Sequence, residues 1–253
     1  MPSATAPTHF LSYSPKSDFY EGLQLMDTIL FIIHIIGIIS FAAAGAMIAI
    51  DKETDFFGVI FLSVITCFGG GLIRDVVAGQ AIGRELPVFF TMYLEITIAI
   101  ITAIIVFFIA KIFQKKYVEE ERIVCDINNV LDALGIGVFS AAGTASYLSL
   151  GPLVAIIMGM LSSVGGSLTR DIMLRDIPFI LCKRIYALAC LIGSAVYYVI
   201  AVYIIPGTDY TNVVATVACV LIIFIIRICA TVFKWNMPKA IHFSKLSDTD
   251  HRS

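Results

Sequence analysis

Seven apolar runs, each long enough to cross a lipid bilayer, constrain this chain more than any other feature. A transmembrane helix needs about 20 consecutive, mostly apolar residues. Runs of this kind cover approximately 28–50, 56–79, 88–113, 127–150, 152–174, 185–205 and 213–233. Only 14% of the residues are charged and 59% are hydrophobic, whereas a soluble domain carries about 25% charged residues. The sequence therefore predicts an all-α polytopic membrane protein with seven transmembrane helices.

Two short motifs mark an internal repeat: GGGLIRD at Gly69–Asp75 and GGSLTRD at Gly165–Asp171. A shift of 96 residues places the first motif on the second, and upstream a shift of 98 places Phe41 on Phe139. Helices one to three therefore resemble helices four to six. Because each unit has three spans, an odd number, the second unit must enter the membrane from the opposite side, which is an inverted-topology repeat. Functional sites in such proteins lie near the membrane midplane, where the two units meet.

The expected domain organisation follows from these boundaries. A flexible N-terminal tail, 1–25, precedes the first three-helix repeat, 26–113. A cytosolic linker, 114–126, leads to the second three-helix repeat, 127–205, then to the seventh helix, 206–238, and a C-terminal tail, 239–253. Lys and Arg gather after helices one, three and five and in the C-terminal tail, so the positive-inside rule places the C-terminus in the cytosol and the N-terminus outside.

The candidate pore or kink residues are the small residues of the two motifs: Gly69, Gly70, Gly71, Gly165, Gly166 and Ser167. A glycine inside a helix costs roughly 1 kcal/mol relative to alanine, so two such clusters need a reason. One explanation is close helix packing. The other is a kink or local unwinding that exposes backbone to a water-filled path. The recurrence of the cluster in both units, each time before a charged pair, favours the second explanation.

Four charged residues follow the glycines about one helical turn later, and they are candidates for pore charge or gating: Arg74, Asp75, Arg170 and Asp171. A charge at membrane depth costs about 2.5–3.5 kcal/mol on insertion scales, so it faces the bundle interior and has a partner. Adjacent residues do not share a helical face, so we expect partners on other helices rather than within one motif. The charges either form a static salt bridge between the units or gate an aqueous path, and the two readings are compatible.

Three further polar residues lie in the apolar runs. His34 and Asp132 occupy matching positions in the two units, and either can face the pore. A lone histidine in a helix is more often a packing residue, which is the alternative reading. Arg227 lies nearer the end of the seventh run, and we expect it to extend towards the membrane interface.

Enzyme and nucleic-acid functions find no support in the sequence. It has no Walker motif, no G-x-S-x-G and no His-Glu metal helix. The formal net charge of −2 leaves no basic stripe for phosphates. None of the six cysteines forms a C-x-x-C, so they indicate neither a disulfide framework nor a zinc site. We expect no cofactor, no metal and no catalytic residue.

Several segments together resemble the prokaryotic-type trimeric intracellular cation (TRIC) channel family, also called the UPF0126 or glycine transporter domain family. They are FGGGLIRDVVAG at 68–79, LDALGIGVFSAAG at 131–143, GPLVAIIMGMLSSVGGSLTRDIMLRDIP at 151–178 and WNMP at 235–238. The resemblance covers about 26–238. It implies a homotrimer in membrane lipid, a pore in each subunit lined by helices two and five kinked at their glycines, and permeation of potassium and also sodium. The family often has aspartate where this chain has His34, so a role for His34 does not follow from the resemblance.

Two functions fit this architecture. One is a passive monovalent cation channel. The alternative is a secondary transporter of a small amino acid such as glycine, in which a half-helix N-terminus binds the carboxylate and carbonyls bind a cation. A purely structural membrane protein is a third reading. The bacterial inner membrane is the expected location.

Overall fold

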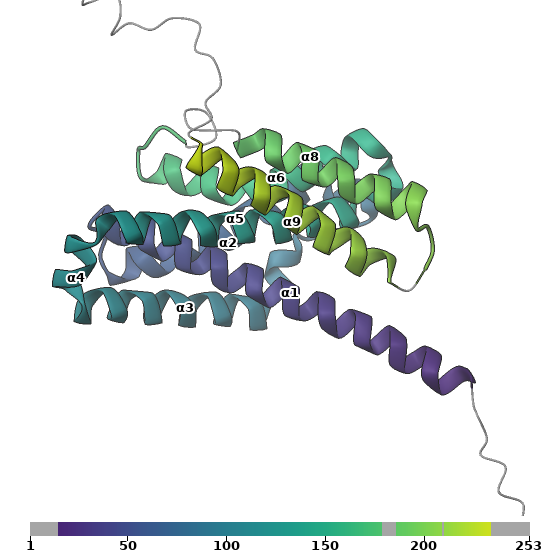
Figure 1. Ribbon diagram of the computed structural model, residues 1–253, viewed down its shortest axis with the longest axis horizontal. Coiled ribbons are helices and arrows are strands. Elements are labelled where there is room, and N and C mark those ends of the chain that lie inside the picture. The colour runs from purple at the N-terminus through teal and green to yellow at the C-terminus, as the bar shows by residue number, and fades with distance from the viewer. Residues whose placement is uncertain (1–14, 179–185, 209, 234–253) are drawn as a thin grey trace, which may run out of the picture.

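The structure, a computed structural model, describes residues 15–178, 186–208 and 210–233, with side chains described from Leu25 onward (Figure 1). Within these residues it is all-helical, with short 3-10 or π turns at 79–82, 88–91, 148–150 and 200–204. The helices are α1 (Pro15–Asp51), α2 (Phe56–Ala78), α3 (Tyr93–Ile112), α4 (Gln114–Glu119), α5 (Glu121–Ser146), α6 (Pro152–Met173), α8 (Tyr186–Val199) and α9 (Thr211–Val232). The described residues contain seven helical segments long and apolar enough to cross a membrane, which confirms the predicted fold class.

Two boundaries differ from the sequence prediction. Helix α1 begins at Pro15, inside the expected tail 1–25, because proline suits the first helical position, where its missing N–H is not needed. Most of the expected linker 114–126 is also helical, since α4 occupies its first half and α5 begins at Glu121. The rest of the predicted N-terminal tail, 1–14, the end of the predicted seventh-helix segment, 234–238, and the whole predicted C-terminal tail, 239–253, lie outside the described residues, as do 179–185 and 209.

The two three-helix units pack in the same way. In the first unit α1, α2 and α3 all contact one another, and in the second unit α5, α6 and α8 do the same. Helices α1 and α5 contact each other, as do α2 and α6, so the units meet through these four helices. Helices α3 and α8 lie at opposite edges of the bundle, and α9 packs across α5 and α8 (Figure 1).

Contacts between matching positions show how the units are related. The ring of Phe41 on α1 stacks on the ring of Phe139 on α5, with centroids 5.1 Å apart and planes 7° apart. A residue that touches its own counterpart is expected near the axis of an inverted repeat. The helix-to-helix contacts also repeat, because Gly45 packs against Thr66 in the first unit while Gly143 packs against Ser162 in the second. The axis itself stays a prediction.

Candidate functional site

The two glycine clusters meet where α2 crosses α6. A Cβ atom at Gly70 would overlap the carbonyl oxygen of Ser162, and a Cβ atom at Gly166 would overlap the carbonyl oxygen of Thr66. Because Gly70 meets Ser162 while Thr66 meets Gly166, the two helices run in opposite directions through the crossing. Backbone therefore touches backbone in the middle of the bundle, and only residues without a side chain allow it.

The helices stay α-helical through these clusters, so the expected local unwinding is wrong. Helix α2 is continuous from Phe56 to Ala78 and α6 from Pro152 to Met173. The physical reason is that glycine in a helix interior lowers its stability without preventing its hydrogen bonds, and here each cluster is held by the backbone of the opposite helix. Close approach, the other explanation drawn from the sequence, accounts for Gly70, Gly165 and Gly166. A bend within a continuous helix stays a prediction.

The first charged pair, Arg74 and Asp75, lies on one side of the crossing, and its two side chains bind each other. The Arg74 Nε donates to Asp75 Oδ1 at 2.8 Å, and both side chains are buried. The expectation that pairing inside one motif would not occur is therefore wrong. Adjacent residues start from different faces, but the arginine side chain is long enough to turn back to the nearest carboxylate when both are removed from water. The expected partner on another helix also exists, because Arg74 Nη1 donates to Ser162 Oγ of α6 at 3.0 Å.

Asp75 also binds three other residues, which come from two parts of the chain. Its Oδ1 accepts from Arg84 Nη1 at 2.9 Å and its Oδ2 accepts from the Val88 backbone N–H at 3.0 Å, both from the connection between α2 and α3. The Tyr147 hydroxyl approaches Oδ1 at 3.4 Å from the end of α5. A tyrosine hydroxyl is protonated at neutral pH, so it can donate to this carboxylate. The carboxylate is thus fully satisfied, with two guanidinium groups around one negative charge.

A cavity of about 150 Å³, here named the Arg74 cavity, opens beside this pair. Its polar lining is His34, Arg74, Asp75, Arg84, Ser146 and Ser162. The His34 ring lies 5.5 Å from the Phe139 ring, and a second cavity of about 330 Å³, which reaches α9, also has His34 in its wall. The structure therefore brings His34, Arg74 and Asp75 to the wall of one cavity next to the glycine crossing.

The second charged pair lies on the other side of the crossing. Arg170 Nε donates to Asp171 Oδ1 at 2.9 Å, again within one motif, and only 2% of Arg170 is exposed. Its Nη1 is buried and has no hydrogen-bond partner in the part of the chain that the structure describes. The two Arg–Asp pairs thus repeat across the crossing, as the sequence repeat predicts.

Asp132 does not share the surroundings of His34, its counterpart in the first unit. Its Oδ2 accepts from Arg227 Nη2 of α9 at 2.7 Å, and its Oδ1 lies 3.3 Å from the Tyr186 hydroxyl, which lies 3.2 Å from Ser167 Oγ. We name these four residues, Asp132, Ser167, Tyr186 and Arg227, the Asp132 cluster. It includes the last of the six candidate kink residues.

Sequence reasoning misplaced Arg227 and missed Arg84, Tyr147, Tyr186 and Ser162. Only 6% of Arg227 is exposed, so it does not reach the membrane interface as expected. The available signal was a single charge inside an otherwise apolar run, which by itself indicates an interior position. For the tyrosines and Ser162 no comparable signal exists, since such residues also occur on lipid-facing and loop surfaces.

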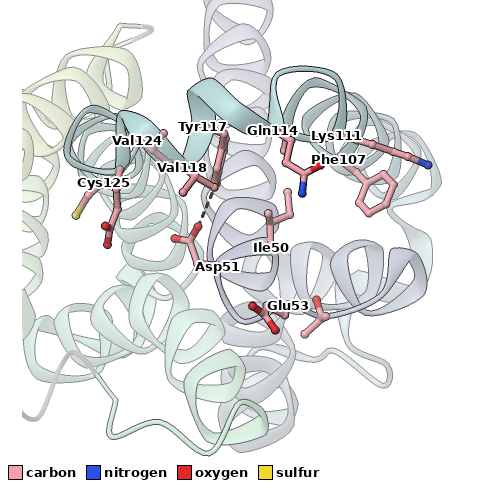
Figure 2. Close-up of a pocket in the computed structure, with 13 residues that line it drawn as sticks. Ile50, Asp51, Glu53, Phe107, Lys111, Gln114, Tyr117, Val118, Val124 and Cys125 are labelled. Carbon is pink, nitrogen blue, oxygen red and sulfur yellow. Dashed lines mark hydrogen bonds between the residues drawn. The ribbon is translucent and has the colours of Figure 1, made fainter.

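Figure 2 shows a larger cavity, about 600 Å³, at the end of the bundle where α1 ends, α4 passes and α5 begins. The Tyr117 hydroxyl donates to Asp51 Oδ1 at 3.2 Å across it. Burial, and next the charge of Asp51, raise the pKa of Tyr117, which keeps the donor protonated. This cavity shares no residue with the Arg74 cavity. Among the described residues, no three His, Cys, Asp or Glu side chains gather as a metal site.

Comparisons with known proteins agree with this architecture. A family model described as "Glycine transporter" matches residues 31–111 and 129–202, which coincide with the two three-helix units. The chain is 34% identical over 168 residues to the UPF0126 inner membrane protein YadS of Escherichia coli K12, covering 65% of this chain and 75% of that protein. It is 31% identical over 190 residues to a UPF0126 membrane protein of Deinococcus radiodurans, covering 74% and 80%.

Solved structures extend the likeness to the whole bundle. A TRIC cation channel studied for the basis of its conductance is 29% identical, with a TM-score of 0.69, covering 83% of this chain and 97% of that one. The TRIC trimeric intracellular cation channel orthologue from Rhodobacter sphaeroides is 28% identical, with a TM-score of 0.68, covering 82% and 100%.

Proposed function

Since the chain belongs to the family described as Glycine transporter, the family of the UPF0126 membrane proteins, we propose that it is a monovalent cation channel that conducts potassium and sodium. The TRIC cation channels it is similar to support a channel rather than a transporter. The chain is an integral membrane protein by its seven apolar helices, and its relatives indicate the bacterial inner membrane.

One observation carries the proposal: polar and charged side chains are buried on both sides of a crossing made of glycines. The Arg74 cavity lies on one side and the Asp132 cluster on the other, and Ser162 and Ser167 bring the two polar groups close to the crossing itself. Charges inside a membrane domain are expensive and usually mark an ion path or a structural ion pair. A pore through the middle of the bundle would connect these two polar regions.

In this arrangement the crossing is the narrowest point, because backbone of α2 touches backbone of α6. Conduction then requires the two helices to separate. Arg74 holds them together through its 3.0 Å hydrogen bond to Ser162, so the same residue closes the path mechanically and repels cations by its charge. The pairs with Asp75 and Asp171 fix the two arginine side chains beside the crossing, but each pair lies within one motif and is not the expected salt bridge between the units.

The assembly and orientation complete the proposal. The TRIC channels of known structure are described as trimeric, and we propose a homotrimer with one pore per subunit. Lys52 follows α1, and Lys115 and Lys116 lie in α4 at the same end of the bundle (Figure 1). The positive-inside rule assigns that end, with the C-terminus, to the cytosol.

Reconstitution of the purified protein into a planar bilayer tests the function. With potassium chloride as the only salt, at different concentrations on the two sides, discrete unitary currents that reverse near the potassium equilibrium potential are the expected result. Saturable glycine-dependent flux without unitary steps would instead establish the transporter. In a conducting protein, Arg74→Gln should raise the potassium current, because it removes both the charge and the bond to Ser162, whereas Lys115→Gln, which removes an exposed charge, should not. Equal currents in the wild type, Arg74→Gln and Lys115→Gln would exclude Arg74 from the path.

A further inference from the structure

We propose that Arg227, on the helix outside the repeat, controls cation passage by neutralising Asp132. When Arg227 binds Asp132, the part of the path beside the Asp132 cluster has no free carboxylate. When the pair separates, Asp132 becomes a binding site for the permeating cation. Arg227 is thus a positioning residue that acts through Asp132, and this proposal rests on the channel function proposed above.

The geometry ties the pair directly to the path. Arg227 Nη2 lies 2.7 Å from Asp132 Oδ2, and the Arg227 Cζ lies 4.1 Å from the centre of the Tyr186 ring. The Tyr186 hydroxyl then contacts both Asp132 Oδ1 and Ser167 Oγ, at 3.3 and 3.2 Å. One hydroxyl proton serves one of these contacts as donor, so the oxygen accepts from Ser167 when it donates to Asp132. A movement of Asp132 would therefore alter the contact between Tyr186 and Ser167 in the glycine motif of α6.

The pair is not a fully satisfied structural bridge. Both side chains are at least nine-tenths buried, and Arg227 Nε has no hydrogen-bond partner within the described ranges. A buried ion pair is most stable when hydrogen bonds satisfy all its remaining donors and acceptors. One guanidinium donor left without a partner lowers the stability of the pair, so less free energy is needed to separate Arg227 from Asp132 than for a fully hydrogen-bonded ion pair.

The difference between the two units points the same way. The position that holds Asp132 in the second unit holds His34 in the first, and His34 lines a cavity. Helix α9 packs on α5 and α8 of the second unit, where Gly137 lets it approach closely at Val220. The acidic position and the helix that neutralises it therefore occur together, on one side of the crossing.

Single-channel recording of Arg227→Gln, Asp132→Asn and the double variant tests the proposal. Arg227→Gln should raise the potassium current and the preference for potassium over chloride about tenfold, within the range of coupling between contacting residues. The double variant should lose this gain, because no carboxylate is released. Arg227→Lys should stay close to the wild type, since it restores the pair. Arg122→Gln removes an exposed guanidinium from the start of α5 and is the matched control.

The outcomes separate this proposal from the proposed function. A silent wild-type protein refutes the channel and this proposal with it. If the wild type conducts and a folded Arg227→Gln variant carries the same current, only the role of Arg227 is refuted. The same holds if Arg227→Gln raises the current equally in the presence and in the absence of the Asp132 carboxylate. If Arg227→Gln does not fold, Tyr186→Phe replaces it, because it keeps the ring beneath Arg227 and removes one hydrogen bond to Asp132. It should increase the same current by a smaller factor, and an unchanged current would again overturn the role of Arg227.

Discussion

Replacing Gly70 by alanine tests the crossing of α2 and α6 directly. The new methyl group would overlap the Ser162 carbonyl oxygen and lie 2.8 Å from the Ser162 carbonyl carbon. Carbon atoms in contact prefer about 3.5–4.0 Å, so the helices must separate by about 0.7 Å or more at this point. The opposing atoms belong to helix backbone, which cannot turn aside as a flexible side chain would.

Gly71→Ala is the matched control. Its methyl group would meet nothing closer than Arg74 Nη2 at 3.9 Å, an ordinary contact. Both changes replace glycine by alanine in the same helix, so the gain in helix propensity, about 1 kcal/mol, cancels between them. What remains is overpacking, which costs about 1–3 kcal/mol, and we expect Gly70→Ala to be less stable than Gly71→Ala by that amount.

Equilibrium unfolding in detergent micelles measures this difference. Gly166→Ala should behave like Gly70→Ala, because its methyl group meets the Thr66 carbonyl from the other side. The double variant should lose less stability than the sum, since the first methyl group has already parted the helices. If Gly70→Ala and Gly71→Ala unfold alike, the backbone contact at the crossing does not exist and the closed path inferred from it fails.

Three other experiments address the charges and the orientation. Asp75→Asn should cost about 3–5 kcal/mol because buried arginine loses its carboxylate, whereas Arg84→Gln, whose side chain is 28% exposed, should cost less than about 1 kcal/mol. Thermal unfolding of both variants distinguishes them, and similar losses would contradict the buried position of Asp75. Lys52→Ala removes an exposed ion pair with Asp176 and should lower the free energy of unfolding by less than about 1 kcal/mol. Repeating the unfolding in about 1 M salt should abolish this difference, and a difference insensitive to salt would argue against the pair. In a variant without Cys182 and Cys229, a membrane-impermeant maleimide should label exposed Cys125 from the cytosolic side only, and labelling from outside would reverse the orientation.

The fold could be predicted because the bilayer imposes it. Span length and the matching motifs at Gly69–Asp75 and Gly165–Asp171 were sufficient to find seven helices in two similar units. The start of α1 at Pro15 was missed because the segment before Leu25 is too polar to count as a span, although helices can extend beyond the membrane.

The site could be predicted only in part, because the sequence shows where glycines lie but not which atoms of another helix pack against them. Gly70 and Gly166 were found, yet their role required the carbonyl groups of Ser162 and Thr66 on the facing helix. The pairing of Arg74 with Asp75 was missed because facing rules describe where side chains start and not how far arginine reaches. Arg227 was misplaced because its distance from the helix end says nothing of the carboxylate on α5 opposite it.

The stacked rings of Phe41 and Phe139 have a mechanical consequence. Because the two rings lie face to face, a rotation of α1 about its long axis would break this contact unless α5 turned with it. A rearrangement of one half alone would lose the stacking between the two rings, so this contact favours a movement in which both halves take part.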